Sequence, residues 1–298
     1  MTPCQKKENN MKKLGILLLA IVVSSFATGC LKRDDLEGIE IYTTTYPVEY
    51  ITQKLYGDHS TVKSIYPDGV DVENYNLTNK QIKDYSKASM FIFNGLSKEK
   101  DYVIPMVNEN KNIKIIDTTL TMEYNHEMEE LWLDPSNFLM LAQNIRNGLK
   151  EYINNHYLKN EIEDRYNELR IEVSNLDAEL KLISESSDNP VIVVSNDAFK
   201  FLEKYGFTVI SLEENSNLTD KTVADVRTMI QNETINYIFT MDNEQVNNTI
   251  TRLQKQTGVQ LQTFHSISNL TEEQRNEKKD YITLMYENLE LLKNELYD

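Results

Sequence analysis

Apolar and polar positions in the first half of the chain follow the pattern of strands that alternate with helices. Three segments are short, apolar or alternating, and rich in residues that favour strands: 39–44, 62–66 and 90–93. Helical spacing covers residues 48–55 and stops near Gly57, and Thr78 with Gln81 has the spacing of a capping box for a short helix. This alternation predicts a parallel α/β lobe over residues 39–133.

Residues 134–186 change to a long helical pattern. Asp134 is expected to cap a helix whose first position is Pro135, where the missing N–H costs no hydrogen bond. Apolar positions then recur through the whole segment: Phe138, Leu141, Ile145, Leu149 and Ile153, followed by Ile162, Tyr166, Leu169, Val173, Leu176, Leu180 and Ile183. The second group steps by four and three, which permits either a coiled-coil dimer or a spine helix that packs on both lobes. The polar stretch 184–190 ends this predicted spine.

The remainder, residues 187–298, repeats the strand and helix alternation. Strands are expected at 191–194, 208–211, 237–240 and 260–264. Helices are expected at 197–205, stopped by Gly206, at 221–231, before Gly258, and at 280–296. The predicted fold is therefore α/β, with two Rossmann-like parallel-sheet lobes joined by a long rigid spine helix and a cleft between the lobes.

The first 30 residues have the parts of an export signal. Lys12 and Lys13 precede an apolar run over 14–23, and small residues lead to Ala27-Thr28-Gly29-Cys30. Charged residues follow at once, and the run is shorter than the roughly 20 apolar residues that a membrane-spanning helix needs. The Ala-Thr-Gly-Cys sequence resembles a lipobox, in which cleavage leaves a lipidated Cys30 as the new N-terminus.

We therefore expect a signal peptide over residues 1–29 and a polar tether over 30–38. The mature protein is then extracytoplasmic and anchored by lipid at Cys30 to the outer face of the cell membrane. The alternative is an ordinary secretory signal with an incidental cysteine. Residues 1–10 do not resemble the start of a signal, so Met11 is a candidate initiator.

Cysteine count and charge exclude several classes of function. Cys4 precedes the cleavage point and Cys30 carries the lipid, so the mature chain has no cysteine for a disulfide, a thiolate ligand or a nucleophile. The whole chain has a formal net charge of -16, and removal of residues 1–29 makes it about -19. A nucleic-acid partner is not expected, because no basic stripe is present to displace counterions from phosphates.

Ligands of parallel α/β sheets bind beyond the carboxyl ends of the strands. Four loops of this chain occupy such positions: 67–73, the residues before Trp132, Ser195-Asn196, and His265-Ser266. Two of these loops precede the predicted spine and two follow it, which predicts a site between the lobes.

Motifs spread over nearly all of the mature chain carry a resemblance to a known family. They are Thr44-Thr45-Tyr46-Pro47, Gly57-Asp58, Pro67-Asp68-Gly69-Val70-Asp71, Phe93-Asn94-Gly95-Leu96, Trp132-Leu133-Asp134-Pro135-Ser136-Asn137, Asp197-Ala198-Phe199 with Tyr205-Gly206, and Ile238-Phe239-Thr240. In this order the chain resembles the zinc and manganese solute-binding lipoproteins of ABC transporters, the family that includes the streptococcal adhesins. The spine then corresponds to that family's rigid connecting helix.

The resemblance implies four metal-ligand positions, and this chain departs from the family at each. Glu73 and Glu130 stand where the family has histidines. Asn196 stands where it has His or Glu, and His265 stands where it usually has Asp. Such an oxygen-rich set suits Mn²⁺ or Fe²⁺ better than Zn²⁺, because the loss of both histidines weakens zinc binding most.

Other interpretations of these residues stay open. Glu73 and Glu130 would be solvated loop carboxylates, Asn196 would cap the helix that starts at Asp197, and His265 would end a strand without a ligand. A different metal cluster would use His126 with Glu127, Glu129 and Glu130. An organic ligand would stack on the tyrosines near the expected cleft, which are Tyr42, Tyr46, Tyr50, Tyr66 and Tyr75.

The sequence favours a binding protein over an enzyme, since no nucleophile elbow, phosphate-cradling loop or zinc-hydrolase motif occurs. The leading hypothesis is a monomeric lipoprotein that captures a divalent cation of the Mn, Zn or Fe class as cargo and delivers it to a membrane permease. The alternative is a diverged paralogue that has lost the metal and serves as an adhesin-like surface protein or binds another ligand.

Overall fold

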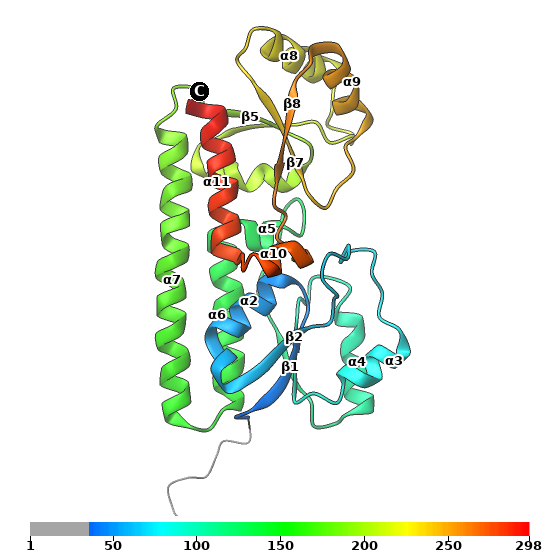
Figure 1. Cartoon of the computed structure of the whole chain (residues 1–298), viewed down its shortest axis with the longest axis vertical. Coiled ribbons are helices and arrows are strands. Elements are labelled where there is room, and N and C mark those ends of the chain that lie inside the picture. Colours follow the sequence, from blue (N-terminus) through cyan, green and yellow to red (C-terminus); the bar gives the residue numbers. More distant parts are fainter. Residues whose placement is uncertain (1–35, 298) are drawn as a thin grey trace, which may run out of the picture. The chain divides into compact units, whose positions relative to one another are not determined.

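The N-terminal lobe is built on a four-stranded parallel sheet with strand order β2-β1-β3-β4 (Figure 1). Its strands are β1 (Ile39–Thr43), β2 (Ser60–Ser64), β3 (Met90–Phe93) and β4 (Lys114–Asp117). Its helices are α2 (Tyr46–Tyr56), the 3₁₀ turn η1 (Gly57–His59), α3 (Asn79–Tyr85) and α4 (Lys100–Glu109). This computed structural model describes residues 36–297, so the predicted signal peptide and Cys30 lie outside the described residues.

Most predicted elements of this lobe are confirmed. The capping box of α3 is present, because Thr78 accepts from the Gln81 N–H while the Gln81 side chain accepts from Thr78. The prediction for β2 was wrong by two residues, since the strand ends at Ser64, whose hydroxyl accepts from the Tyr66 N–H. α4 and β4 were not predicted, because α4 contains Pro105, an internal helix breaker, and β4 has only four residues.

The predicted spine over 134–186 consists of two helices. Asp134 caps α6 (Pro135–Tyr152) as expected, by accepting from the Ser136 N–H. The chain then leaves helical geometry, and Asn155 caps α7 (His156–Glu185) by accepting from the Tyr157 N–H. α6 and α7 are antiparallel and contact each other (Figure 1). The long connecting helix is therefore α7 alone, 30 residues in length.

The apolar stripe of α7 packs on helices of the same chain. α7 contacts α2, α6, α11 (Tyr281–Tyr297) and η2 (Asp197–Tyr205), so both lobes bury it. All seven residues of the predicted seam are buried: Ile162, Tyr166, Leu169, Val173, Leu176, Leu180 and Ile183. The heptad spacing is thus accounted for by packing within the chain, as the spine interpretation predicted.

The C-terminal lobe repeats the topology of the first, with parallel strand order β6-β5-β7-β8. Its strands are β5 (Val191–Val194), β6 (Thr208–Ser211), β7 (Tyr237–Met241) and β8 (Gln260–Phe264). η2, α8 (Asp220–Gln231) and α9 (Asn248–Thr257) connect them, and α10 (Glu272–Asn276) and α11 follow. Gly206 and Gly258 adopt φ values of 99° and 77° at the ends of η2 and α9, a left-handed conformation that glycine permits at no steric cost.

The segment after β8 attaches to the N-terminal lobe. The Tyr46 N–H donates to the Ser268 carbonyl at 3.0 Å, and the Gly69 N–H donates to the Leu270 carbonyl at 2.8 Å. Arg275 in α10 forms two bonds to Glu49 of α2. The chain therefore crosses between the lobes twice, and residues 38–297 form one unit.

No helix among residues 36–297 has both the length and the apolar character needed to cross a membrane.

Candidate functional site

The four loops selected from the sequence lie at the carboxyl ends of strands, as predicted. Residues 67–73 follow β2, and Ser195-Asn196 and His265-Ser266 follow β5 and β8. The loop before Trp132 follows β4 and leads into the short helix α5 (Glu130–Leu133). Loops of the two lobes are in contact, because the Asn243 amide after β7 donates to Glu129 Oε1 at 2.9 Å.

Glu73 has an exposed side chain. Its backbone is held on both sides, because its N–H donates to Asp71 Oδ1 at 2.9 Å and its carbonyl accepts from Lys98 Nζ at 2.7 Å. The backbone of Glu73 is therefore fixed while its carboxylate faces solvent.

Glu130 is buried and bonds within its own loop. Its Oε2 accepts from the Asn125 N–H at 3.0 Å and from the His126 N–H at 3.3 Å. Only 7% of the residue is exposed. The Glu130 carboxylate therefore holds the loop that precedes α5, a role that differs from the solvated carboxylate and the metal ligand considered from the sequence.

Asn196 caps η2, as one of the two interpretations predicted. Its Oδ1 accepts from the Ala198 N–H at 2.9 Å, and its Nδ2 donates to Glu244 Oε2 at 2.7 Å. Glu244 in turn accepts from the Met241 N–H and the Ser195 hydroxyl. The amide oxygen that a cation would need is already used in the cap.

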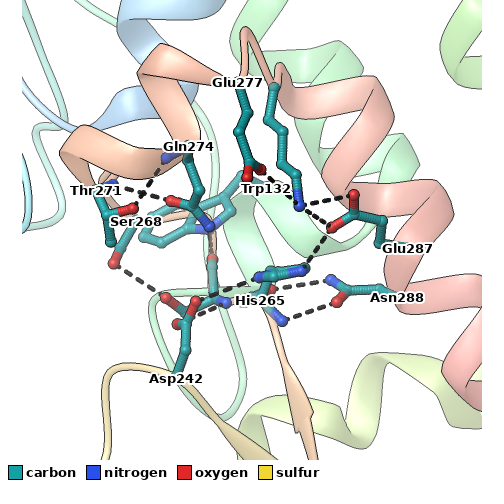
Figure 2. Close-up of polar contacts among 11 residues, drawn as sticks. Trp132, Asp242, His265, Ser268, Thr271, Gln274, Glu277, Glu287 and Asn288 are labelled. Atoms are coloured by element: carbon teal, nitrogen blue, oxygen red, sulfur yellow. Dashed lines mark hydrogen bonds and ion pairs between the residues drawn. The ribbon is translucent and has the colours of Figure 1, made fainter.

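His265 lies between two carboxylates (Figure 2). Its Nε2 is 2.9 Å from Glu287 Oε2, and its Nδ1 is 3.6 Å from Asp242 Oδ2. Asp242 is the main cause of a raised His265 pKa, to which Glu287 also contributes. Asn288 holds the backbone of His265 at both its N–H and its carbonyl.

A protonated imidazole cannot bind a metal, because the ligand is the neutral ring nitrogen. The contacts of His265 therefore favour an internal ion pair over cation binding. Lys279 adds a further positive charge, with Nζ 3.1 Å from Glu287 Oε2.

Other carboxylates from both lobes lie close enough to repel one another. Burial raises the pKa of Glu129, and the charges of Glu73 and Glu244 raise it further. Burial also raises the pKa of Glu127, with contributions from Glu213, Glu129 and Glu73. Glu73, Glu127 and Glu129 belong to the N-terminal lobe, whereas Glu213 and Glu244 belong to the other, so a cation between the loops would relieve the repulsion.

The sequence identified only part of this carboxylate group. Glu127 and Glu129 appeared with His126 in one alternative cluster, whereas Glu213 and Glu244 were not selected, although they follow β6 and β7 and satisfy the same strand-end rule. Within residues 36–297, no three His, Cys, Asp or Glu side chains converge in a geometry that would hold a metal ion.

Two parallel α/β lobes, whose strand-end loops meet beside a long connecting helix, define a two-lobed binding protein. The family model described as ZnuA, "Zinc-uptake complex component A periplasmic", matches residues 41–295, and the chain belongs to this family.

Individual relatives agree with this assignment. Zinc-binding lipoprotein AdcA of Streptococcus pneumoniae (strain ATCC BAA-255 / R6) is 24% identical over 312 residues, which cover 95% of this chain and 61% of AdcA. Manganese ABC transporter substrate-binding lipoprotein PsaA of Streptococcus anginosus is 25% identical over 243 residues, 74% of this chain and 78% of PsaA. The chain thus spans less than two thirds of the length of AdcA.

A solved structure supports the same fold. The Zn(II)-bound ZnuA-like domain of Streptococcus pneumoniae AdcA superimposes with a TM-score of 0.71 at 22% identity, covering 88% of this chain and all of that domain. The family resemblance and the two-lobed fold predicted from the sequence are confirmed.

Proposed function

We propose that this chain is the solute-binding component of an ABC transporter for a divalent cation. The observation that carries the proposal is the group of carboxylates from both lobes whose charges raise the pKa of Glu127 and Glu129, in a chain of the ZnuA family. Relatives named for zinc binding and for manganese transport support the same class of cargo.

Glu73 and Glu129 are the primary cation ligands in this proposal. Glu73 has an exposed carboxylate, and Glu129 has a buried one. The negative charge of Glu73 raises the pKa of Glu129, so the two carboxylates repel each other. Of the four residues selected from the sequence, Glu130, Asn196 and His265 join the cation only by exchanging their present partners. A mainly carboxylate set favours Mn²⁺ or Fe²⁺ over Zn²⁺.

The remaining features of the proposal follow from family membership and from the N-terminal sequence. The protein is extracytoplasmic, anchored to the outer face of the cell membrane by lipid at Cys30, monomeric, and without catalytic activity. It delivers the cation to a permease in the membrane. The relatives AdcA and PsaA are themselves named as lipoproteins, which supports the anchor.

Isothermal titration of the purified protein with Mn²⁺, Zn²⁺ and anaerobic Fe²⁺ tests the proposal. We expect one saturable site, with Mn²⁺ or Fe²⁺ bound more tightly than Zn²⁺. Glu73→Ala and Glu129→Gln should each weaken binding by about tenfold or more, because each removes a charged ligand. Glu109→Gln, an exposed carboxylate at the far end of α4, is the matched control and should bind as the wild type does.

The absence of saturable binding by all three cations would overturn this proposal. It would favour the second candidate, a paralogue that keeps the fold without the cation. The contacts of His265 and Asn196, whose metal-binding atoms are already engaged, are the observation that favours this candidate.

A further inference from the structure

A pocket of about 240 Å³ lies at the carboxyl edge of the N-terminal sheet. Three loops line it, and each follows a different strand of that sheet, namely β2, β3 and β4. The lining residues are Val72, Glu73, Leu96, Ser97, Lys98, Glu99, Tyr124, Glu127 and Met128. This is the edge at which parallel sheets place their ligands.

Glu99 contributes a buried carboxyl group to the pocket. Only 2% of the residue is exposed. Its Oε1 accepts from the Tyr66 hydroxyl at 2.8 Å, whereas its buried Oε2 has no hydrogen-bond partner among residues 36–297. Burial raises the Glu99 pKa to about 7. A buried oxygen without a partner is costly, so a hydrogen-bond donor brought by a ligand to the pocket that Glu99 lines would stabilise this carboxyl group.

The charge of the pocket selects a cation. Glu73 and Glu127 line it together with Glu99. Lys98, whose Nζ donates to the Glu73 carbonyl at 2.7 Å and to the Tyr75 carbonyl at 2.5 Å, is the one basic residue of the lining and offsets only one of the three acidic side chains. An anion would therefore meet uncompensated carboxylates, whereas a cation would meet opposite charge.

The remaining lining residues favour an organic cation over a bare metal ion. Val72, Leu96 and Met128 supply apolar surface, and Tyr124 supplies an aromatic ring that is 38% exposed. The ammonium group of an organic cation can bind to a single buried carboxylate, and the carbon atoms of that cation gain from apolar and aromatic contacts.

We propose that this pocket binds a small organic ammonium ion, with its N–H groups on Glu99 Oε2 and its carbon chain against Tyr124 and Met128. The ligand is smaller than a typical drug, since the pocket is below the roughly 300 Å³ at which drug-sized sites begin. This site belongs to the N-terminal lobe and shares Glu73 with the proposed metal site, but its binding of an ammonium ion does not require that a metal be transported.

Ligand-observed NMR and calorimetry with n-butylammonium, and with n-butanol as its neutral counterpart, test the site on the purified protein at pH 7.5. We expect saturable binding of n-butylammonium and at least tenfold weaker binding of n-butanol. Glu99→Gln keeps the shape of the side chain and an acceptor for Tyr66, and should weaken n-butylammonium binding at least tenfold. Tyr124→Ala, at a partly exposed loop position, should weaken it severalfold.

Controls separate this site from loss of structure and from the metal proposal. Glu109→Gln removes the same charge from an exposed position of α4 and should bind n-butylammonium as the wild type does. Mn²⁺ titrations of Glu99→Gln should match the wild type. Unsaturable binding of n-butylammonium, or equal affinity in Glu99→Gln and wild type, would overturn the proposal. Displacement of n-butylammonium by Mn²⁺ from the wild type and from Glu73→Ala alike would also overturn it, since the pocket would then be a metal site.

Discussion

The Glu99 carboxyl group gives up nearly all of its hydration on folding and accepts a hydrogen bond from the Tyr66 hydroxyl, while its Oε2 has no partner within residues 36–297. The Glu295 carboxyl group is also buried and its pKa also rises to about 7, yet both its oxygens accept from backbone N–H groups at the start of β7. The two carboxyl groups thus have similar acidity for the same main reason, burial, but only Glu99 retains an unused acceptor.

Replacement of Glu99 by Gln is expected to change stability in a pH-dependent way. The pKa rises from 4.5 to about 7 on folding, so the folded state retains the proton more strongly. The wild type is therefore most stabilised by this group below pH 4.5, and it loses that contribution as the pH rises toward 7. We expect the free energy of unfolding of Glu99→Gln, relative to that of the wild type, to rise by up to about 3 kcal/mol between pH 4.5 and pH 8.

Urea unfolding of both proteins at pH 4.5 and pH 8 measures this change. An equal difference in unfolding free energy at the two pH values would show that folding does not raise the Glu99 pKa.

The sequence located the candidate site only to within a loop. Glu129 and Glu130 are adjacent, and successive residues of a helical turn point about 100° apart. Glu130 therefore bonds back to its own loop, while Glu129 accepts from Asn243 of the other lobe. His265 was predictable as the residue after β8, but its partner Glu287 lies 22 positions later on α11. Such a pairing depends on tertiary packing that a pattern of residues does not contain.

Among the helices, α7 shows how a heptad pattern arises without a coiled-coil dimer. Leu176 is fully buried in the stripe that faces helices of the same chain. We expect Leu176→Ala to lower the free energy of unfolding by about 3 kcal/mol, through lost burial and the cavity left behind. The sedimentation mass should be that of a monomer for both proteins. A dimeric wild type that the substitution dissociates would show that the stripe is shared between two chains.

The pattern of the sequence predicted the order of these elements better than their ends. The apolar period runs through Ile153 toward Ile162, so it concealed the break between α6 and α7. That break is marked only by the capping residue Asn155. A polar residue of this kind also occurs on the exposed face of an uninterrupted helix, so it does not by itself indicate a break. α4 was missed for the opposite reason, because Pro105 signals a break in a helix that continues.

At the scale of the whole molecule, Arg275 joins α10 to two segments of the N-terminal lobe. It donates to both oxygens of Glu49, at 3.0 and 2.8 Å, and its Nε pairs with Asp68. Lysine cannot reproduce this planar, bidentate geometry. We expect Arg275→Lys to lower the free energy of unfolding by roughly 1–3 kcal/mol, as measured by urea unfolding.

Arg170→Lys, at an exposed position of α7, is the control and should be close to neutral. Unfolding should remain a single transition in both variants, since each lobe contributes to the packing of the other. An unchanged unfolding free energy in Arg275→Lys would mean that water and lysine stabilise the Glu49 and Asp68 carboxylates as well as Arg275 does.

The double crossing between the lobes also limits how the gene can be divided. A fragment that stops after α7 would lack the segment after β8, whose Ser268 and Leu270 carbonyls accept from the N–H groups of Tyr46 and Gly69. It would also expose the apolar stripe of α7 that α11 covers. A fragment that starts at β5 would contain the segment after β8 but not the N-terminal lobe to which that segment bonds. Neither half is a self-sufficient module, so recombination between relatives should preserve function when the exchange occurs outside residues 38–297 and abolish it when the exchange separates the halves.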